Sequence, residues 1–318
     1  MSLGSGVCAF RLRYQGEEVF TNSSIKDKLR YWVSEFFPRQ MPLNLEKLNK
    51  LFTLKLFSVD RYVVVSHIYF SGSVDEFGRP VPDAVGVVLE DGLFDAYGRD
   101  IFSIAEYLRE FRDREPSELE VGLLTYLEEK SFLLDNDRLG KALKYYSGFL
   151  DLYSGIISSM LRGRRVVVVS NPSNIITALS GILLFMPKVL FSRLNISTFC
   201  EDLSEEVEDI VFVDRSTWIP ASSQVSVFDF ASGSMTKVDR LRFIDVFLRE
   251  LCSDAWYSFS IIEFYRFIMD LLSDYMRRGK LDLNENRKVY MIISTYKRIE
   301  KFRSSLEGLR KELKEVRI

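Results

Sequence analysis

Residues 164–195, RRVVVVSNPSNIITALSGILLFMPKVLFSRLN, constrain the fold of this chain more than any other stretch. Residues 166–169 form a wholly apolar, β-branched run, which is typical of a strand covered on both faces. Asn171 and Asn174 are suited to cap a helix, and Pro172 is suited to its first turn. A buried strand that leads at once into an apolar helix predicts an α/β protein.

The turn at residues 170–174 is also a candidate binding site. Free backbone amides and the helix dipole attract anions to a helix N-terminus. The turn contains no glycine and no lysine, so it is not a phosphate-cradling loop. One functional alternative is therefore an anion- or nucleotide-binding enzyme that uses Asn171, Ser173 and Asn174, with Arg193 or the loop at residues 71–83 closing over the ligand.

Composition narrows the classes of function. The 43 basic and 45 acidic residues leave a net charge of −2, which predicts no nucleic-acid partner. Three widely spaced cysteines predict neither a zinc site nor a disulfide framework, and they favour a reducing cytoplasm. The N-terminus lacks the pattern of a signal peptide, and the apolar helix at 175–186 is too short to span a bilayer. Abundant charge and few glutamines favour a thermophilic source. We expect no cofactor and no metal.

The pattern of apolar residues divides the chain into three parts. Residues 1–135 predict an α+β portion with a mostly antiparallel sheet, and residues 136–255 predict an α/β portion that begins with one long helix at 137–161. Residues 256–318 predict a helical C-terminal extension. The expected fold class is therefore α/β, with an α+β beginning and a helical end.

The last predicted helix carries a narrow apolar seam. Its members recur at steps of three and four residues: Ile292, Tyr296, Ile299, Phe302, Leu306, Leu309 and Leu313. The seam either packs on the body of the protein or binds a partner. We expect the part around residues 292–302 to pack, and the part from Leu306 onward to project or self-associate.

Few residues are candidates for acid–base chemistry. His67 is the one histidine, and its apolar neighbours in VVVSHIYF favour a structural role, hydrogen-bonded or half-exposed at an edge. Carboxylates crowd residues 201–209, which is better explained as a solvated acidic segment than as a catalytic pair. We therefore expect no catalytic residues and a protein that is not an enzyme.

The loop at residues 71–83, SGSVDEFGRPVPD, has two interpretations. Its glycines and prolines predict a stiff connection between strands. In the first interpretation Arg79 pairs with Asp75 or Glu76 inside a long hairpin. In the second, Arg79 contacts a ligand or a partner. The sequence leaves both open.

Several segments, in their order along the chain, resemble the N-terminal domain of the GTPase-associated proteins of bacterial and archaeal NTP-dependent conflict systems. The first is a strand followed by an Asp-x-x-Gly-Arg loop (Asp75, Gly78 and Arg79), and the second is the VVVVS strand with its helix. Next come a Ser- and Thr-rich strand, RLNISTF, which contains Arg193, Ser197 and Thr198, and the motif VFDFASG. Where the family tends to have a glycine and a histidine after its Gly-Arg loop, this chain has VPDA.

This resemblance implies a non-enzymatic adaptor or regulator that acts through a small GTPase, with no catalytic residues to carry over. Asp75, Gly78, Arg79, Arg193, Ser197 and Thr198 are then candidate partner-binding residues. The VVVVS strand before a helix is also similar to DENN modules, which activate small GTPases by nucleotide exchange. A DENN-like exchange module is therefore a second alternative.

Overall fold

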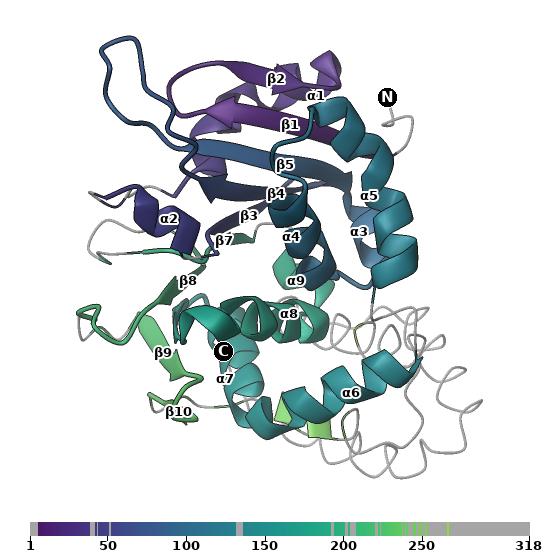
Figure 1. The fold of residues 1–318 in the computed structure, drawn as a ribbon. Helices are drawn as coiled ribbons and strands as arrows, with labels where there is room; N and C mark the ends of the chain where they lie inside the picture. The colour runs from purple at the N-terminus through teal and green to yellow at the C-terminus, as the bar shows by residue number, and fades with distance from the viewer. Residues whose placement is uncertain are drawn as a thin grey trace.

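The computed structural model describes residues 6–38, 42, 44–50, 52–131, 136–191, 194–200, 203, 208–219, 222, 224–236, 238, 240, 244–245, 248–249, 252 and 266. The protein has an α/β fold in which ten described strands form one mixed sheet (Figure 1). Their order is β10-β9-β6-β8-β7-β3-β4-β5-β1-β2. The predicted C-terminal seam lies outside the described residues.

The first half of the sheet is antiparallel. It contains β1 (Val7–Arg13), β2 (Glu18–Phe20), β3 (Leu54–Val59), β4 (Tyr62–Tyr69) and β5 (Asp83–Glu90). Side chains alternate between two cores because successive residues of a strand point to opposite faces. Val63 and Val65 of β4 join the main core, whereas Val64 faces a second core.

The second half of the sheet is mostly parallel. It contains β6 (Arg165–Val169), β7 (Asn195–Ser197), β8 (Ile210–Val213), β9 (Val225–Asp229) and β10 (Ser234–Met235). Strand β6 pairs in parallel with β8 and β9, and β7 pairs in parallel with β8. Residues 166–169 are buried on both faces, as the valine run predicts.

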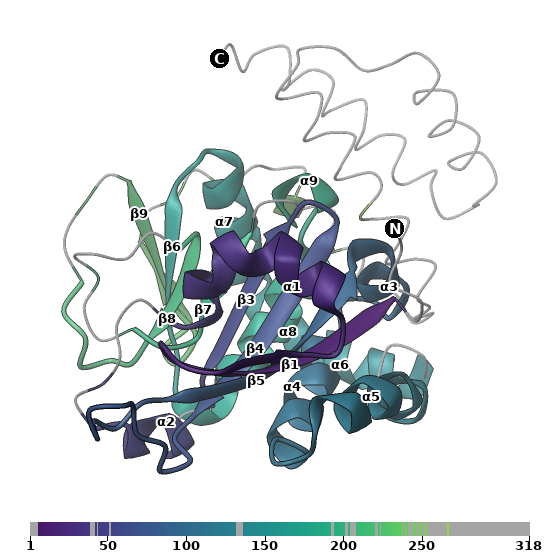
Figure 2. The ribbon, with the colours of Figure 1, turned by 90° about the horizontal axis from the view of Figure 1, so that it is seen from above.

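Helices cover the two faces unequally (Figure 2). The main core is packed by α3 (Asp91–Ala96), α4 (Ile101–Glu110), α5 (Pro116–Lys130), α6 (Asn136–Tyr146), α7 (Leu150–Leu161), α8 (Ile175–Phe185) and α9 (Lys188–Phe191). The opposite face of the first half is packed by α1 (Ser23–Leu29), the 3-10 helix η1 (Arg30–Phe36) and α2 (Glu46–Lys50).

Two sequence-based expectations need correction. The single helix expected at 137–161 is interrupted by the 3-10 helix η2 (Ser147–Phe149). The Ser147 hydroxyl donates to the Lys144 carbonyl, which satisfies the end of α6 locally, and Gly148 disfavours a continuous helix. Asn171 and Asn174 do not cap their helices through their side chains, although Pro172 does occupy the first turn of the 3-10 helix η3 (Pro172–Asn174).

The two halves meet where β3 pairs antiparallel with β7. Lys55 lies opposite Ser197 in this pairing, and its ammonium forms a salt bridge with Glu208, just before β8. Both side chains are 0% exposed. Glu208 is therefore not part of a solvated acidic segment, because it neutralises a buried lysine; residues 201, 202 and 204–207 lie outside the described part. The predicted domain boundary at 135 and 136 remains a prediction.

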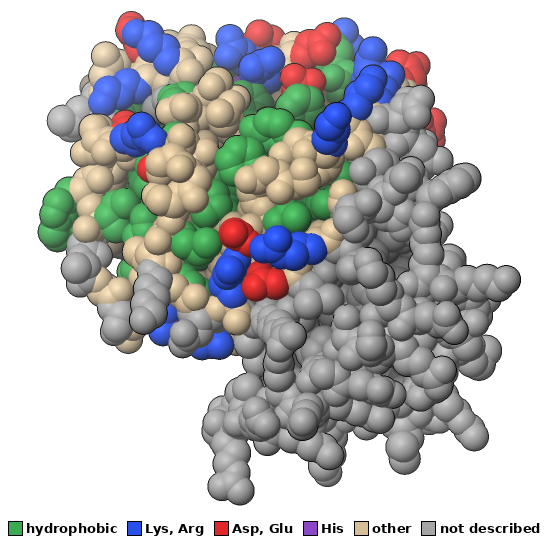
Figure 3. Space-filling model, turned by 90° about the horizontal axis from the view of Figure 1, so that it is seen from below, with side chains coloured by type: hydrophobic (Ala, Val, Ile, Leu, Met, Phe, Trp, Pro, Cys, Tyr) green, Lys and Arg blue, Asp and Glu red, His purple; other side chains and the backbone are tan. Residues whose placement is uncertain are grey.

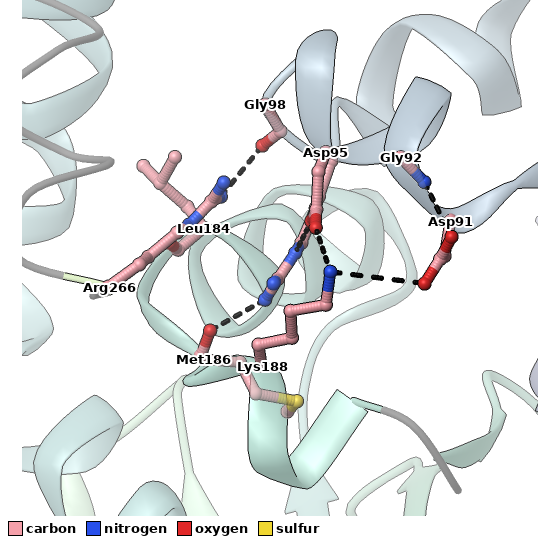
Figure 4. A network of polar contacts seen from close by, with 9 residues as sticks. Asp91, Gly92, Asp95, Gly98, Leu184, Met186, Lys188 and Arg266 are labelled. Carbon is pink, nitrogen blue, oxygen red and sulfur yellow. Dashed lines mark hydrogen bonds and ion pairs between the residues drawn. The ribbon is translucent and has the colours of Figure 1, made fainter. Parts of the chain in front are cut away.

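A polar network on the main-core side also joins the halves (Figure 4). The buried Arg99 guanidinium donates to Asp95 (2.6 Å) and to the Met186 carbonyl (2.6 Å). Arg266, from the C-terminal part, donates to the carbonyls of Leu184 and Gly98 at 2.9 and 2.8 Å. Each of the two arginines therefore donates both to a group at the end of α3 and to a carbonyl at the end of α8.

We predict that the Lys55–Glu208 pair is costly to break on one side only. Lys55→Met should lower the free energy of unfolding by about 3 to 5 kcal/mol, because it leaves an unpaired buried carboxylate. The double variant Lys55→Met/Glu208→Leu should regain most of that loss, since no charge remains buried. Urea unfolding of the three proteins measures this, and a double variant less stable than the single one would contradict the prediction.

Candidate functional site

Strand direction gathers many of the predicted site residues at one edge of the sheet. Strands β1, β4, β6, β7, β8 and β9 all run in the same direction, because β3 is antiparallel to both of its neighbours and β5 is antiparallel to both of its own. The hairpin loop after β4 and the turn after β6 therefore emerge at the same edge, on the left in Figure 1. Helix α2 lies at this edge too.

A pocket of about 490 Å³ opens at the carboxyl ends of β6, β7 and β8. Its wall includes Ser170 and Pro172 from the predicted strand-to-helix turn. Two lysines of α2, the first residue of α8, the last two residues of β8 and residues that follow β7 and β8 complete the wall: Lys47, Lys50, Ile175, Phe212, Val213, Thr198, Phe199, Cys200, Asp214, Ser216, Thr217 and Trp218. Ligands of open α/β sheets commonly bind outside the carboxyl ends of the strands.

This pocket lies where the chain changes direction across the sheet. From β6 the chain passes through α8 to β7 on one side, and from β8 it crosses to β9 on the other side of β6. The pocket lies at the carboxyl ends of the strands from which these two connections leave the sheet.

Polar and aromatic groups line the rim of the pocket. The Asp214 carboxylate accepts hydrogen bonds from the Ser216 hydroxyl and backbone amide, and these bonds hold the pKa of Asp214 below its usual value. Trp218 is 74% exposed. The rim thus offers two lysines, one fixed carboxylate and an exposed indole ring.

The predicted side chains of the β6 turn, Asn171, Ser173 and Asn174, are exposed, as is Pro172. The Ser173 hydroxyl approaches the Asn174 side-chain oxygen at 3.4 Å. Although these three residues neighbour Ser170 and Pro172, the pocket wall includes none of them. The turn therefore borders the pocket through Ser170 and Pro172, whereas the side chains that the sequence predicted to bind a ligand do not line it.

Ser197 and Thr198 face the interior of the protein. The Ser197 hydroxyl donates to the Phe199 carbonyl at 2.7 Å, and Thr198 accepts from the Leu54 amide at 2.7 Å. The Thr198 bond joins the residue after β7 to β3, and the Ser197 bond closes a local turn at the end of β7. Only Thr198 also reaches the pocket wall, and Arg193 lies outside the described residues.

The loop between β4 and β5 is a hairpin fastened by its own side chains. Val74 and Pro80 form an antiparallel bridge, and the Arg79 guanidinium pairs with Asp75 at 2.6 Å. Gly78 has a φ of +75°, a conformation that glycine adopts without strain. The backbone amide of Arg79 is the main cause of the lowered pKa of Asp75. Of the two interpretations of the loop, the structure contains the pairing of the first, between Arg79 and Asp75. Contact of Arg79 with a ligand or a partner stays a prediction.

The hairpin does not close over the pocket. Strand β4 is two strand spacings, about 10 Å, from β7 and four from β6, and no residue of the hairpin loop lines the pocket. The hairpin instead borders a hollow of about 290 Å³ that it shares with the turn at residues 14–17. The pocket and the hollow beside the hairpin are thus two separate surfaces at the same edge of the sheet.

Sequence reasoning missed several pocket residues. Lys47 and Lys50 lie on a short helix whose lysines resemble any solvated pair, and only the fold brings them to the ends of β7 and β8. Asp214, Ser216 and Thr217 had a usable signal, because polar residues directly after a buried strand lie at the carboxyl edge of a parallel sheet. That signal follows the run IVFV at residues 210–213.

Charge and metal-ligand patterns do not single out either surface. Basic and acidic side chains are interspersed on the face drawn in Figure 3. Within the described residues, no group of three His, Cys, Asp or Glu side chains is arranged to hold a metal ion. The described helices also include none with the length and apolar character needed to cross a membrane.

Comparison with known proteins gives no relative to assist the interpretation. No protein-family model matches the sequence, and no curated protein matches it significantly.

We predict that His67 is neutral in the folded protein throughout pH 5 to 8. Burial lowers its pKa from 6.5 to about 4, while its Nδ1 lies 3.2 Å from the Thr53 carbonyl oxygen. Its ring stacks between Phe52 and Tyr69, so the expected structural role is hydrogen-bonded and not half-exposed.

The unfolded chain takes up this proton near pH 6.5, so stability is full above that pH and declines as the pH falls toward 4. The loss approaches about 3 kcal/mol, and His67→Gln should remove it from the pH dependence of unfolding. Because the chain has one histidine, NMR titration of the imidazole is unambiguous. A midpoint between pH 6 and 7 in the folded protein would overturn the prediction.

Proposed function

We propose that this protein acts by binding, as a non-enzymatic adaptor or regulator of a small GTPase in a conflict or defence system. The observation that carries the proposal is the hairpin between β4 and β5, which the Asp75–Arg79 ion pair and the Val74–Pro80 bridge hold in place. It contains the Asp-x-x-Gly-Arg motif on which the resemblance depends, and it holds Phe77 73% exposed at its tip. The resemblance supplies the class of partner.

The physical properties of the hairpin suit a partner contact. The Asp75–Arg79 pair, the Val74–Pro80 bridge and the hydroxyls of Ser71 and Ser73 on Asp83 order the loop before any partner binds. A preordered loop loses little conformational entropy on binding. An exposed aromatic side chain can then bury a large apolar area at the centre of an interface.

The Arg79 guanidinium lies 5.1 Å from the centre of the Phe77 ring. The loop therefore presents an apolar anchor beside a charged group, and Val74, 49% exposed, adds apolar surface nearby. Aromatic residues and arginine are enriched in the energetically dominant parts of interfaces. This combination favours a protein partner over a small ligand at the hairpin.

We predict that Phe77→Ser weakens the complex with a GTPase encoded near this gene at least tenfold and leaves the melting temperature unchanged. The ring is exposed, so its removal costs the free protein little, whereas an interface anchor is typically worth about 2 kcal/mol or more. The matched control is Val121→Ser, at a 78% exposed position on α5, away from the hairpin. Calorimetry with the GDP- and GTP-bound forms measures both variants.

The same experiment separates regulation from exchange. Acceleration of labelled GDP release by the wild-type protein, lost in Phe77→Ser, would identify a DENN-like exchange module. Binding without acceleration would identify an adaptor. Absence of a complex in either nucleotide state, or equal loss in both variants, contradicts the proposal.

The pocket at the ends of β6, β7 and β8 supports a second candidate function, binding of a phosphate-bearing ligand such as a nucleotide. Its volume of about 490 Å³ falls in the usual range for small-molecule sites. Lys47 and Lys50 supply positive charge for phosphate, and the Trp218 ring supplies a surface for stacking. The anion or nucleotide site that the sequence predicted at the β6 turn is therefore proposed at the adjacent pocket instead.

We predict that a phosphorylated metabolite or nucleotide raises the melting temperature if this second function is correct. A ligand at a hundred times its dissociation constant stabilises the folded state by about 2.7 kcal/mol. Lys47→Ala/Lys50→Ala should remove the shift, whereas Lys141→Ala/Lys144→Ala on α6, also exposed, should not. A panel of such ligands without any shift, or a shift retained in the α2 variant, would exclude the pocket as this site.

A further inference from the structure

The hollow beside the hairpin lies between two turns that are distant in the sequence. Strand β1 runs in the same direction as β4, so the turn between β1 and β2 emerges beside the hairpin loop (Figure 1). The Tyr14 backbone amide donates to the Pro82 carbonyl at 3.0 Å and joins this turn to the base of the hairpin. Residues 13–17 line one side of the hollow, and residues 74–77 and 79 line the other.

Both arginines that line the hollow have a partner of their own. The Arg79 guanidinium binds Asp75 through Nη2 at 2.6 Å and through Nε at 2.7 Å. The Nε atom of Arg13 lies 3.7 Å from Asp83 Oδ1, at the base of the hairpin. Each guanidinium is thus matched by one aspartate, so the arginines do not give the hollow a positive charge.

Glu17 and Glu76 give the hollow its net charge. They lie on different turns, both are exposed, and neither carboxylate has an ion-pair partner in the part of the chain that the structure describes. Two unmatched negative charges therefore border one concave surface. A cation that enters it is attracted by both carboxylates at once, and more strongly than at either carboxylate alone.

A single basic side chain suits this hollow better than a metal ion or a larger ligand. Among the described residues, no group of three His, Cys, Asp or Glu side chains is arranged to hold a metal ion. The volume of about 290 Å³ is at the lower limit for small-molecule sites, which begin at about 300 Å³. A lysine or arginine side chain carries its charge at the end of a slender, flexible stem.

Exposed apolar groups beside the charges favour a protein as the source of the cation. Phe77 lines the hollow and is 73% exposed, and Val74 lines it and is 49% exposed. A partner protein can cover both side chains while one of its basic residues reaches the carboxylates, whereas a free cation leaves the phenyl ring in water. Aromatic anchors next to charged groups are typical of the dominant contacts of interfaces.

We infer that the partner of this surface inserts a lysine or arginine side chain between Glu17 and Glu76, so that the β1–β2 turn and the hairpin form one interface. The inference rests on the proposed function, because it takes a protein as the partner of the hairpin. It adds a second contacting turn and the chemistry of the partner's surface. It does not require the partner to be a GTPase.

The test uses the full chain and three blocked tripeptides. These are acetyl-Leu-Lys-Leu-amide, its arginine counterpart and its acetyl-lysine counterpart, which keeps the stem without the charge. In NMR titrations the backbone amides of Gly16 and Gly78 should shift together, and at least one basic peptide should bind about fivefold or more tighter than the neutral one. Equal binding of all three peptides, or no shift with any, overturns the inference.

Variants locate the site. Glu17→Gln and Glu76→Gln should each weaken the basic peptide, and the double variant should bind it about fivefold or more weakly without any change for the neutral peptide. The matched control is Glu128→Gln/Glu129→Gln, which removes two exposed carboxylates at the C-terminal end of α5. A loss confined to one of the single variants shows that the turns do not share a site and contradicts the inference.

One further probe distinguishes the source of the cation. n-Butylamine carries the lysine ammonium without a peptide backbone. If it binds more tightly than the lysine peptide, the hollow is a small-molecule site and the inference of a protein partner is wrong. Weaker binding, with loss in the double variant, supports the docking of a basic side chain from a protein.

Failure of this inference is distinguishable from failure of the proposed function. The peptides contain no GTPase, so equal peptide binding overturns the basic contact, while calorimetry with Phe77→Ser still decides whether a GTPase binds the hairpin. A GTPase complex that keeps its affinity in Glu17→Gln/Glu76→Gln overturns the inference alone.

Discussion

The antiparallel pairing of β3 with β7 is the contact on which the rest of the architecture depends. It turns an antiparallel half and a parallel half into one sheet. Lys55 and Glu208 meet beside this pairing as a buried ion pair, and Thr198 bonds the backbone of Leu54. Because a buried charge is stable only with its partner, this junction tolerates one register far better than any other. The portions predicted at residues 1–135 and 136–255 therefore share one sheet, which is joined by the β3–β7 pairing.

The direction of strands on either side of that junction determines where the surfaces form. Since β3 runs against both β4 and β7, the carboxyl ends of β4, β6, β7 and β8 share one edge, and the carboxyl end of β3 lies at the other. The hairpin and the lysine-lined pocket both lie at the first of these edges. The residues that line the pocket and those that line the hollow beside the hairpin do not overlap, so occupation of one surface leaves the residues of the other accessible.

The sequence predicted the parts of this arrangement that depend on local pattern. The valine run of β6 and the α/β class follow from neighbouring residues, and the Asp75–Arg79 pairing is one of the two interpretations that the loop sequence left open. The contacts of Lys55 with Glu208 could not be predicted, because they join positions 153 residues apart and a lysine within a strand has no local signal of burial. The role of Thr198 was hidden for the same reason, because its hydroxyl bonds the backbone of Phe52 and Leu54, which only the fold brings near. The Ser197 hydroxyl bonds the Phe199 carbonyl, which is local. A pocket does lie at the β6 turn, but its lysines come from a distant helix.

The arginine network between α3 and α8 extends the same reasoning to the C-terminal part. Burial raises the pKa of Asp95, but the charges of Arg99, Arg266 and Lys188 outweigh burial and hold that pKa below its ordinary value. Asp95 is therefore an anion that requires its cations, and Arg266 is one of them while it also bonds the backbone at Gly98 and Leu184. A residue from the C-terminal part thus completes a contact between the two halves (Figure 4). Loss of the Arg266 guanidinium would leave the Gly98 and Leu184 carbonyls without this donor and would remove one of the three cations that lower the pKa of the half-buried Asp95, so this one side chain stabilises the contact between the ends of α3 and α8.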